Sequence, residues 1–297
     1  MDRIDAMQAF VAVADLEGFA PAARKLGLSP SGVTRLVSAL EERLGARLLQ
    51  RTTRSVALTD AGARYLERAR RILADVEEAE GAAEGERLSP RGRLVVSAPV
   101  GFGRLHVSPV VSEYLKRFPD VSAELRLSDL TINLVDEGVD VAVRIGHLPD
   151  SSLVARHVGQ VRRIVVASPG YLDKHGEPES PEAVMSHHTI QFSALSASGW
   201  RFLKDGQELR IAPTPRLITN SSDAAAQYAV QDGGLTRVLA YQAADEIKDG
   251  RLKVVLRKFE ERPLPIHVVY PTSRLLSAKV RTFIDLVLEI SNWDFGG

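Results

Sequence analysis

Apolar residues in the first 58 positions recur three and four apart, which is the spacing of helices that bury one face. The run Met7–Ala14 predicts a first helix that ends before Gly18. A second short helix is predicted over Ala20–Leu26, with Gly27 as its C-terminal stop. The chain therefore begins with two short helices in close succession.

A third helix is predicted between Ser29 and Gly45. Ser29 is placed to cap it, Pro30 occupies the first position, where a missing N–H costs nothing, and Gly45 terminates it. Its apolar stripe consists of Val33, Leu36, Val37, Leu40 and Leu44. Its other face presents Ser31, Gly32, Thr34, Arg35 and Ser38. Two helices joined by a tight glycine-containing turn, the second with small polar residues at its exposed start, predict a helix-turn-helix.

The small residues at this helix start suit the major groove of DNA, which admits one helix and excludes bulky side chains on its leading turn. Ser31, Gly32 and Thr34 would let the backbone approach the bases. The positive helix N-terminus and the serine and threonine hydroxyls can contact phosphates, and Arg35 can reach a guanine edge. We therefore interpret the third helix as a DNA-recognition helix.

Residues 47–58 predict two short strands around a polar tip, a wing that carries Arg51, Thr53 and Arg54. The chain has no net charge, with 38 basic and 38 acidic residues, but residues 24–54 contain seven basic and two acidic side chains and so carry a charge of +5. A basic patch on an otherwise acidic molecule favours a nucleic-acid partner. The alternative is an ordinary three-helix bundle with a solvated basic face.

Residues 59–88 predict a single long helix with Thr59 as its N-cap. Apolar residues step alternately by four and three in a heptad seam made of Tyr65, Ala69, Ile72, Val76, Ala79 and Ala83. Arginines occupy the first half of the helix and glutamates the second, so an antiparallel partner would place unlike charges side by side. We expect this linker helix to join two copies of the chain; the alternative is a helix packed only on its own domain.

From residue 89 onward the pattern changes to alternating strands and helices. Strands are predicted at Arg93–Ala98, Ser122–Ser128, Val139–Ile145, Leu153–Val158, Arg163–Ser168, Thr189–Phe192, Arg216–Thr219, Arg251–Leu256 and Pro265–Tyr270, with a hairpin at Trp200–Ile211. Helices are predicted at Leu105–Phe118, Leu130–Glu137, Asp223–Asp232, Gln242–Lys248 and Ser277–Ile290. This alternation predicts α/β architecture with largely parallel sheets. We divide residues 91–297 into one subdomain of 91–162 with 267–297 and another of 163–266.

Two such subdomains would enclose a cleft lined by strand ends and helix starts, suited to a small anion or polar molecule. The candidate effector contacts are Pro99, Val100, Gly101, Phe102, Arg144, Gly146, Phe192, Asn220, Ser221 and Thr236. Each has a purely structural alternative: the glycines can serve turns, Asn220 can cap a helix, and Arg144 can form an ion pair.

Enzyme chemistry is not evident in the sequence. No Gly-x-Ser-x-Gly, phosphate-binding loop or His-Glu-x-x-His motif occurs, and the seven histidines are scattered. Gly101-Phe102-Gly103 follows a predicted strand, but His106 stands where a dinucleotide-binding fingerprint has its third glycine. The chain has no cysteine, which excludes thiol catalysis and cysteine-based metal sites and fits a reducing compartment. We expect no catalytic residue, no metal and no cofactor.

The sequence contains no run of 18 apolar residues, and Asp2 and Asp5 interrupt the first ten positions. It therefore predicts neither a membrane span nor a signal peptide. We expect a cytoplasmic protein.

Over essentially its whole length the chain resembles the LysR-type transcriptional regulators. Residues 7–59, with their Leu-Gly and Arg-Thr-Thr-Arg runs, are similar to that family's winged helix-turn-helix. The stretches "GRLVVSAP", "LVDEGVDVAVRIGHLPDSSLVAR" and "PLPIHVVYP" are similar to its effector-binding domain, whose fold is like that of type II periplasmic binding proteins.

The resemblance implies a cytoplasmic homodimer or homotetramer that binds a dyad-symmetric promoter site in double-stranded DNA and takes a small-molecule effector in the cleft. It also admits RNA polymerase as a partner. It places Ser29, Ser31, Thr34 and Arg35 on the recognition helix, and Arg51, Thr53 and Arg54 on the wing. Gly32 stands where Ala or Ser is more usual in the family, which should loosen the helix by ~1 kcal/mol.

Our leading hypothesis is thus a DNA-binding transcriptional regulator whose promoter binding or bending responds to an effector. Two alternatives belong to other classes. One is a small-molecule binding protein whose N-terminal domain only dimerises, and the other is an enzyme that uses the α/β cleft.

Overall fold

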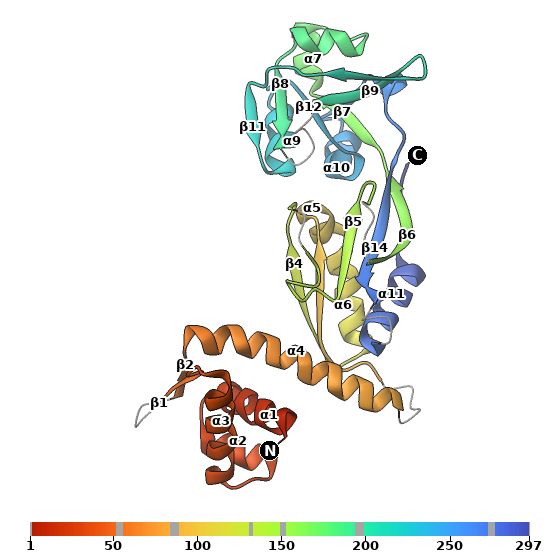
Figure 1. The fold of residues 1–297 in the computed structure, drawn as a ribbon. Coiled ribbons are helices and arrows are strands. Elements are labelled where there is room, and N and C mark those ends of the chain that lie inside the picture. Colours follow the sequence, from red (N-terminus) through yellow and green to blue (C-terminus); the bar gives the residue numbers. More distant parts are fainter. Residues whose placement is uncertain are drawn as a thin grey trace. The chain divides into compact units, whose positions relative to one another are not determined.

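The structure is a computed structural model that describes residues 2–51, 56–83, 89–130, 133–148, 153–193, 199–272 and 277–296. In the helix over residues 60–83, side chains are described through Arg70 and again at Ile72, Leu73 and Val76. The chain forms two compact units, Met1–Leu88 and Ser89–Gly297 (unit 1 and unit 2; Figure 1).

Unit 1 consists of three short helices, a two-stranded hairpin and a long helix. These are α1 (Arg3–Asp15), α2 (Phe19–Leu26), α3 (Pro30–Leu44), β1 (Leu49–Arg51), β2 (Val56–Leu58) and α4 (Asp60–Ala83). The Asp2 carboxylate accepts a hydrogen bond from the N–H of Ile4 at 2.9 Å and so caps α1. Gly27 and Gly45 end α2 and α3 in the left-handed conformation, with φ of 65° and 63°. The predicted winged helix-turn-helix is confirmed.

The core of unit 1 lies between the apolar faces of the short helices. Phe10 of α1 and Val33, Val37 and Leu40 of α3 are buried there. Leu44, which the spacing assigns to the same face, is instead 41 % exposed. It lies in the last turn of α3, where the chain leaves the helix for the wing.

A buried carboxylate holds the hairpin against α3. Glu41 is 6 % exposed, and its Oε1 accepts hydrogen bonds from the N–H of Leu48 at 2.8 Å and of Leu49 at 3.0 Å. These two residues lead into β1, which pairs with β2 in antiparallel register. The base of the hairpin is therefore held in position by α3 itself.

Helix α4 starts against the same hairpin. Thr59 is its N-cap: the hydroxyl donates to the carbonyl of Arg47 at 2.8 Å and accepts from the N–H of Gly62 at 2.9 Å. A Cβ at position 62 would lie 2.0 Å from the Leu48 carbonyl oxygen, a distance that no side chain tolerates. Glycine at this position is therefore required for α4 to approach the wing.

The predicted seam of α4 needs one correction. Tyr65, its first residue, packs against Phe10 with ring centroids 5.5 Å apart and belongs to the core of unit 1. Ile72, its third residue, is 41 % exposed. Residues 84–88 of the predicted helix, and the side chains of the last two seam residues, lie outside the described part of the chain. Ala69, its second residue, is fully buried as well, so the exposed part of the seam begins at Ile72.

Unit 2 contains two sheets. The first has six strands in the order β15-β6-β14-β5-β3-β4. Its strands are β3 (Gly92–Ala98), β4 (Val121–Leu127), β5 (Val141–Ile145), β6 (Leu153–Val161), β14 (Leu264–Pro271) and β15 (Trp293–Phe295). The accompanying helices are α5 (Val100–Phe102), the π-helix η1 (Gly103–Val107), α6 (Ser108–Arg117) and α11 (Ala278–Ile290). Helices α6 and α11 contribute to one apolar core with this sheet.

The second sheet has five strands in the order β11-β8-β12-β7-β13. Its strands are β7 (Arg163–Ala167), β8 (Thr189–Phe192), β11 (Leu217–Thr219), β12 (Leu235–Leu239) and β13 (Lys253–Val255), and a separate hairpin is formed by β9 (Trp200–Lys204) and β10 (Gln207–Ile211). The helices are α7 (Pro169–His175), α9 (Ser222–Val230) and α10 (Ala244–Lys248), with 3-10 turns η2 (Pro181–Ser186), η3 (Ala240–Ala243) and η4 (Arg257–Phe259). Each sheet with its helices forms one α/β subdomain, as predicted (Figure 1).

The sheets are mixed rather than largely parallel. β14 runs antiparallel to both β5 and β6, and β7 runs antiparallel to both β12 and β13. The reason is the connectivity. β6, β7 and β14 flank the passages between the two sheets, whereas the strands joined by local crossovers, such as β3 with β4, are parallel.

The sequence also misassigned some local structure. The described part of the predicted helix 130–137 is a turn over residues 134–138, where Asn133 Oδ1 accepts from the N–H of Val135 at 3.1 Å and Gly138 has φ of 62°. Strand β12 was missed because Arg237 interrupts its short apolar run. Strand β15 was missed because it has only three residues.

The chain passes between the two sheets at two places. β6 leads directly into β7 at Arg162, and the return segment runs from η4 to β14. β14 begins at Leu264, inside the range 163–266 that the prediction gave to the second subdomain. Arg162 Nε lies 3.4 Å from Glu260 Oε2 of the return segment, and both side chains are largely buried. The two crossing segments are therefore joined to each other.

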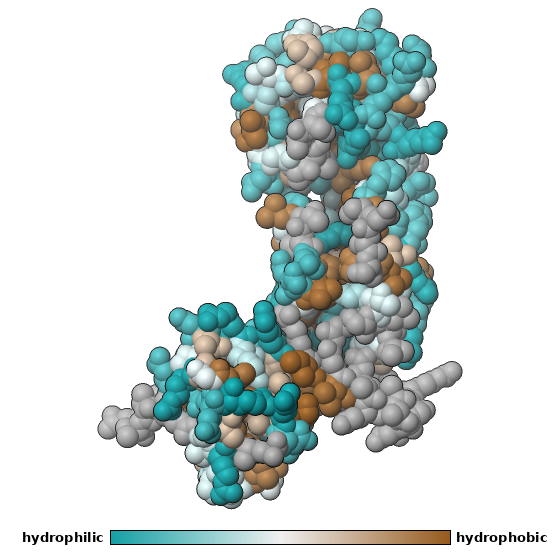
Figure 2. Space-filling view, in the orientation of Figure 1, coloured by the Kyte–Doolittle hydropathy of each residue, from teal (hydrophilic) through white to brown (hydrophobic). Residues whose placement is uncertain are grey.

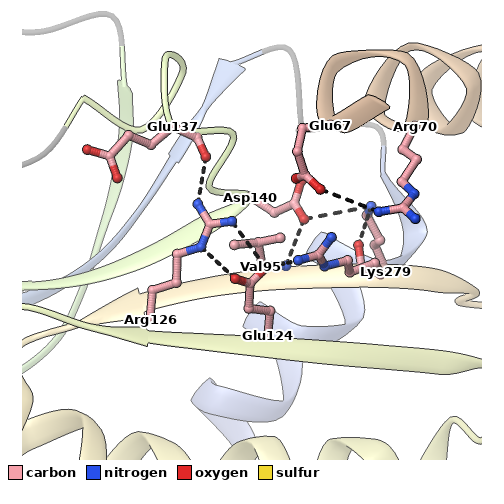
Figure 3. Close-up of polar contacts among 9 residues, drawn as sticks. Glu67, Arg70, Val95, Glu124, Arg126, Glu137, Asp140 and Lys279 are labelled. Carbon is pink, nitrogen blue, oxygen red and sulfur yellow. Dashed lines mark hydrogen bonds and ion pairs between the residues drawn. The ribbon is translucent and has the colours of Figure 1, made fainter. Parts of the chain in front are cut away.

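An internal ion pair joins α11 to the first sheet. Lys279 Nζ of α11 lies 3.7 Å from Asp140 Oδ2 and donates to the Arg93 carbonyl oxygen at 2.8 Å, and Asp140 Oδ2 also accepts from the N–H of Val95 at 2.9 Å (Figure 3). Both side chains are buried. This pair ties α11 to the start of β3 and to the loop before β5.

Hydrophilic residues cover most of the described surface in the view of Figure 2. Among the described helices, none has both the length and the apolar character that crossing a lipid bilayer requires.

Candidate DNA-binding and effector sites

The start of α3 carries the predicted DNA contacts on its exposed side. Ser29 Oγ accepts from the N–H of Gly32 at 3.1 Å and lies 3.1 Å from Ser31 Oγ, and the Thr34 hydroxyl donates to the Pro30 carbonyl at 2.9 Å. Ser31 is exposed and Gly32 and Thr34 are half-buried. The first turn of α3 therefore carries only small side chains, and the hydroxyls of Ser29 and Thr34 are held by hydrogen bonds to backbone groups of the helix.

Arg35 projects from the next turn of α3 and is exposed. Glu41, one of the two acidic residues counted in the basic stretch 24–54, is buried and bonded to backbone N–H groups. Glu42 is the exposed one. Because one of its two carboxylates is withdrawn into the interior, the surface of this stretch is more positive than the sequence count suggests.

The wing is described only at its base. β1 and β2 pair with Leu49 opposite Leu58 and Arg51 opposite Val56. Thr53 and Arg54 lie outside the described residues, as does the side chain of Arg51.

A cavity of about 430 Å³ lies in unit 2. Its lining comprises Pro99, Ser128, Asp129, Leu130, Arg144, Ile145, Gly146, His147, Arg163, Phe192, Arg201, Leu239, Tyr241, Gln242 and Leu264. These residues come from both sheets, from the loops that follow β3, β4 and β5, from η3 and from the β9–β10 hairpin. Four of the predicted effector contacts, Pro99, Arg144, Gly146 and Phe192, are among them.

The other six predicted contacts are not in this lining. Two of them, Phe102 and Thr236, are buried in the protein core. Phe102 is fully buried, with its ring centroid 5.2 Å from that of Tyr241 and 5.1 Å from that of Trp293. Thr236 is fully buried in β12 and donates to the Ile190 carbonyl at 3.3 Å.

The remaining four contacts lie around α5 and the start of α9. Ser221 caps α9 through the N–H of Ala224, and Asn220 precedes it. Val100 has an exposed side chain. Gly101 lies close to the start of α9, since a Cβ added at this position would be 3.5 Å from Ser222 Oγ. These residues border the junction of the two subdomains rather than the cavity.

Several lining residues escaped the sequence analysis, above all Asp129, Arg163, Arg201 and Tyr241. The Asp129 carboxylate accepts from the N–H of Val100 at 3.1 Å at the start of α5. Arg163 begins a predicted strand and Arg201 is the second residue of the predicted hairpin, and a charged residue beside apolar neighbours was the available signal for both. Burial, with the nearby Asp129 charge, raises the pKa of Tyr241, so this phenol stays neutral.

Comparisons with known proteins match both units. Residues 4–63 match the model of the bacterial regulatory helix-turn-helix protein, lysR family, and residues 87–291 match that of the LysR substrate binding domain. The second match alone covers more than half of the chain. The chain belongs to the LysR family of transcriptional regulators.

Relatives of this regulator match it over nearly its whole length. An HTH-type transcriptional regulator of Xanthomonas campestris pv. campestris is 36% identical over 290 residues, which is 96% of this chain and 84% of the relative. The structure of CrgA, a LysR-type transcriptional regulator from Neisseria meningitidis, has a TM-score of 0.62 and 32% identity, covering 97% of this chain and 99% of that one. The full-length structure of the Vibrio cholerae virulence activator AphB has a TM-score of 0.62 at 26% identity, with the same coverage.

The family assignment makes the chain a transcriptional regulator with a helix-turn-helix DNA-binding domain and an effector-binding domain. Within the described residues, no group of three or more histidine or carboxylate side chains has an arrangement that could hold a metal ion.

Proposed function

We propose that this regulator binds a dyad-symmetric promoter site through α3 and the wing, and that a small molecule in the cavity of unit 2 changes how it binds or bends that DNA. The observation that carries the proposal is the capped, slim start of α3, with Arg35 exposed one turn further on. Ser29, Ser31, Gly32, Thr34 and Arg35 form the reading head, and the wing arginines contact the backbone beside it.

The cavity supports the second half of the proposal. It has the size of a small-molecule site and combines an apolar wall with a few charged groups. Its lining is drawn from both sheets, so a bound molecule would favour one relative arrangement of the two subdomains over others. A change of this kind alters the spacing of two reading heads, and with it the access of RNA polymerase to the promoter. We assign no catalytic role to the cleft.

Binding to duplex DNA tests the reading head. The full-length protein should bind random duplex at low salt and lose affinity steeply as salt rises, with a log–log slope of about −0.9 for each phosphate contacted.

On the promoter site beside its own gene, Arg35→Ala should weaken binding by about 1–3 kcal/mol and relax the preference at one base position. Arg54→Ala should weaken binding to all sequences about equally. Fluorescence anisotropy with a set of single-base variants measures both effects.

Arg210→Ala provides the matched control, because Arg210 is an exposed arginine of the β9–β10 hairpin in unit 2. It should bind every duplex like the parent. If Arg35→Ala binds like Arg210→Ala at all base positions, α3 is not the reading head.

A homodimer follows from the promoter symmetry, and we propose that α4 forms the contact along the seam that includes Ile72. Ile72 is a large apolar residue with 41 % of its surface exposed, and a carboxylate there would be buried against the partner. Ile72→Glu should therefore give monomers at concentrations where the parent is a dimer or a tetramer. Analytical ultracentrifugation of the full-length protein measures the mass, and an unchanged mass would place the contact elsewhere.

A regulator of this kind acts where the bacterial chromosome lies, so we propose that it works in the cytoplasm. The alternative function, a small-molecule binding protein whose N-terminal unit only dimerises, leaves the slim entrance of α3 without a role. It would show effector binding without any retention on duplex DNA.

A further inference from the structure

Three arginines of unit 2 share a single carboxylate. Arg163 Nη1 lies 3.1 Å from Glu261 Oε2, Arg201 Nε lies 3.2 Å from Oε1, and Arg237 donates to the same carboxylate. Three cations around one anion leave an excess of positive charge. The cluster is therefore not neutral by itself.

This excess positive charge is largely shielded from solvent. The Arg237 side chain is 2 % exposed and that of Arg163 is 10 % exposed. Burial, with repulsion from Arg163, lowers the pKa of Arg237 to about 9, and burial also lowers the pKa of Arg163. Arg163 Nε and Arg237 Nη1 are buried donors with no acceptor in the described part of the chain. Uncompensated charge and unpaired donors are costly in such surroundings.

Two of the three arginines face the cavity. Arg163 and Arg201 line it, and so does Arg144 of β5, from the other sheet, whose Nη2 is also a buried donor without an acceptor among the described residues. Against these cations, Asp129 is the one carboxylate in the described lining, and it is occupied by the N–H of Val100. The cavity therefore presents three guanidinium groups from both subdomains, of which Arg163 and Arg201 share the single carboxylate of Glu261 and Arg144 has, within the described residues, only the nearby charge of Glu137 outside the lining.

The rest of the lining is apolar enough to cover an organic body. Pro99, Ile145, Phe192, Leu239 and Leu264 all contribute to it. A guanidinium group can bind a carboxylate through two parallel hydrogen bonds. Arginines held in fixed orientations therefore favour a carboxylate as the bound anion.

We propose that the effector is a small organic carboxylate whose charged end is held by Arg163 and Arg201 of the second subdomain and by Arg144 of the first, with its apolar body against the wall of the cavity. This inference rests on the proposed role of the cavity as the effector site. Glu261 keeps the arginines in place while the site is empty, and the ligand supplies the missing negative charge. Binding therefore links the two sheets through a single anion.

Calorimetric titration of the full-length protein tests the charge requirement. The probes are benzoate, phenylacetate, hexanoate and succinate, each compared with its neutral amide at constant ionic strength, and inorganic phosphate. At least one carboxylate should bind saturably with at least tenfold higher affinity than its amide, because the amide carries no negative charge and its NH2 group donates instead of accepting. Inorganic phosphate should bind more weakly than that carboxylate, because it leaves the apolar wall uncovered.

Single substitutions then locate the site. Arg201→Gln and Arg144→Gln should each raise the dissociation constant of that carboxylate about tenfold or more. Arg201 is the most exposed member of the cluster and Glu261 keeps two partners without it, so the variant should fold normally. Arg210→Gln, on the neighbouring strand of the same hairpin, is the matched control and should bind like the parent.

The inference is overturned if no carboxylate of the series binds, if the amides bind equally well, or if phosphate binds as tightly as any carboxylate. An unchanged affinity in Arg144→Gln would overturn the bridging arrangement. The same samples are tested on duplex DNA. Protein that binds duplex but no carboxylate contradicts this inference alone, whereas protein that binds a carboxylate but no duplex contradicts the proposed function.

Discussion

Replacing Glu41 by alanine should lower the free energy of unfolding of unit 1 by about 2–5 kcal/mol, because the N–H groups of Leu48 and Leu49 lose their buried acceptor. These groups lie where the chain passes from α3 to β1, so the wing should also lose its fixed position beside the recognition helix. Duplex affinity should fall with it. Hydrogen exchange of the Leu48 and Leu49 amides measures the local effect, and hydrogen exchange of the α1 and α3 amides at increasing urea measures the stability of unit 1.

The adjacent Glu42→Ala is the matched control, since Glu42 is exposed and should change stability by less than about 0.5 kcal/mol. Both tryptophans, Trp200 and Trp293, lie in unit 2. Their fluorescence transition should therefore be the same in the parent and in Glu41→Ala. Equal amide protection in the two variants would show that the carboxylate does not hold the wing.

Replacing Asp140 by alanine should destabilise unit 2 by about 3–5 kcal/mol, because the Lys279 ammonium would stay buried without its counter-charge and the Val95 N–H would lose its acceptor. The urea midpoint of tryptophan fluorescence reports this loss directly, since Trp293 belongs to the same core as α11. The amide protection of the unit 1 helices should persist to the same urea concentration as in the parent.

Asp136→Ala serves as its control. Asp136 lies in the same loop, is exposed, and accepts one hydrogen bond from Asn133 at 2.7 Å. Its loss should shift the midpoint little. The double variant Asp140→Ala with Lys279→Met should recover part of the stability, because it removes the stranded charge. If Asp140→Ala is as stable as Asp136→Ala, the internal ion pair contributes nothing.

The sequence was most informative in unit 1, where local signals decide the structure. Ser29, Gly27 and Gly45 mark helix ends by chemistry that is read within a few residues of each position. The buried role of Glu41 was not readable, because a glutamate in an amphipathic helix looks the same whether it meets water or the backbone of a strand. Tyr65 was misplaced for a similar reason: its spacing fits two faces of α4, and only its contact with Phe10 decides between them.

In unit 2 the sequence predicted the α/β class but not the strand directions. Those depend on which strands carry the chain between the sheets, and no local pattern records that. The cavity was predicted in part through Pro99, Arg144, Gly146 and Phe192, which lie at the ends of strands or start a helix. Arg163 and Arg201 come from segments far apart in sequence and meet only through Glu261. Such convergence is a property of the folded chain.

The ion pair of Arg162 with Glu260 has a mechanical consequence. The ion pair joins the two segments that connect the subdomains. The Arg162 N–H also donates to the Phe295 carbonyl at 3.2 Å, and the Arg162 carbonyl accepts from the N–H of Ala240 at 2.9 Å. Because both connecting segments run through this point, any change in the angle between the subdomains must bend the backbone near Arg162 and Glu260. A molecule bound in the cavity, whose lining comes from both subdomains, would therefore transmit its effect through this pair of connections.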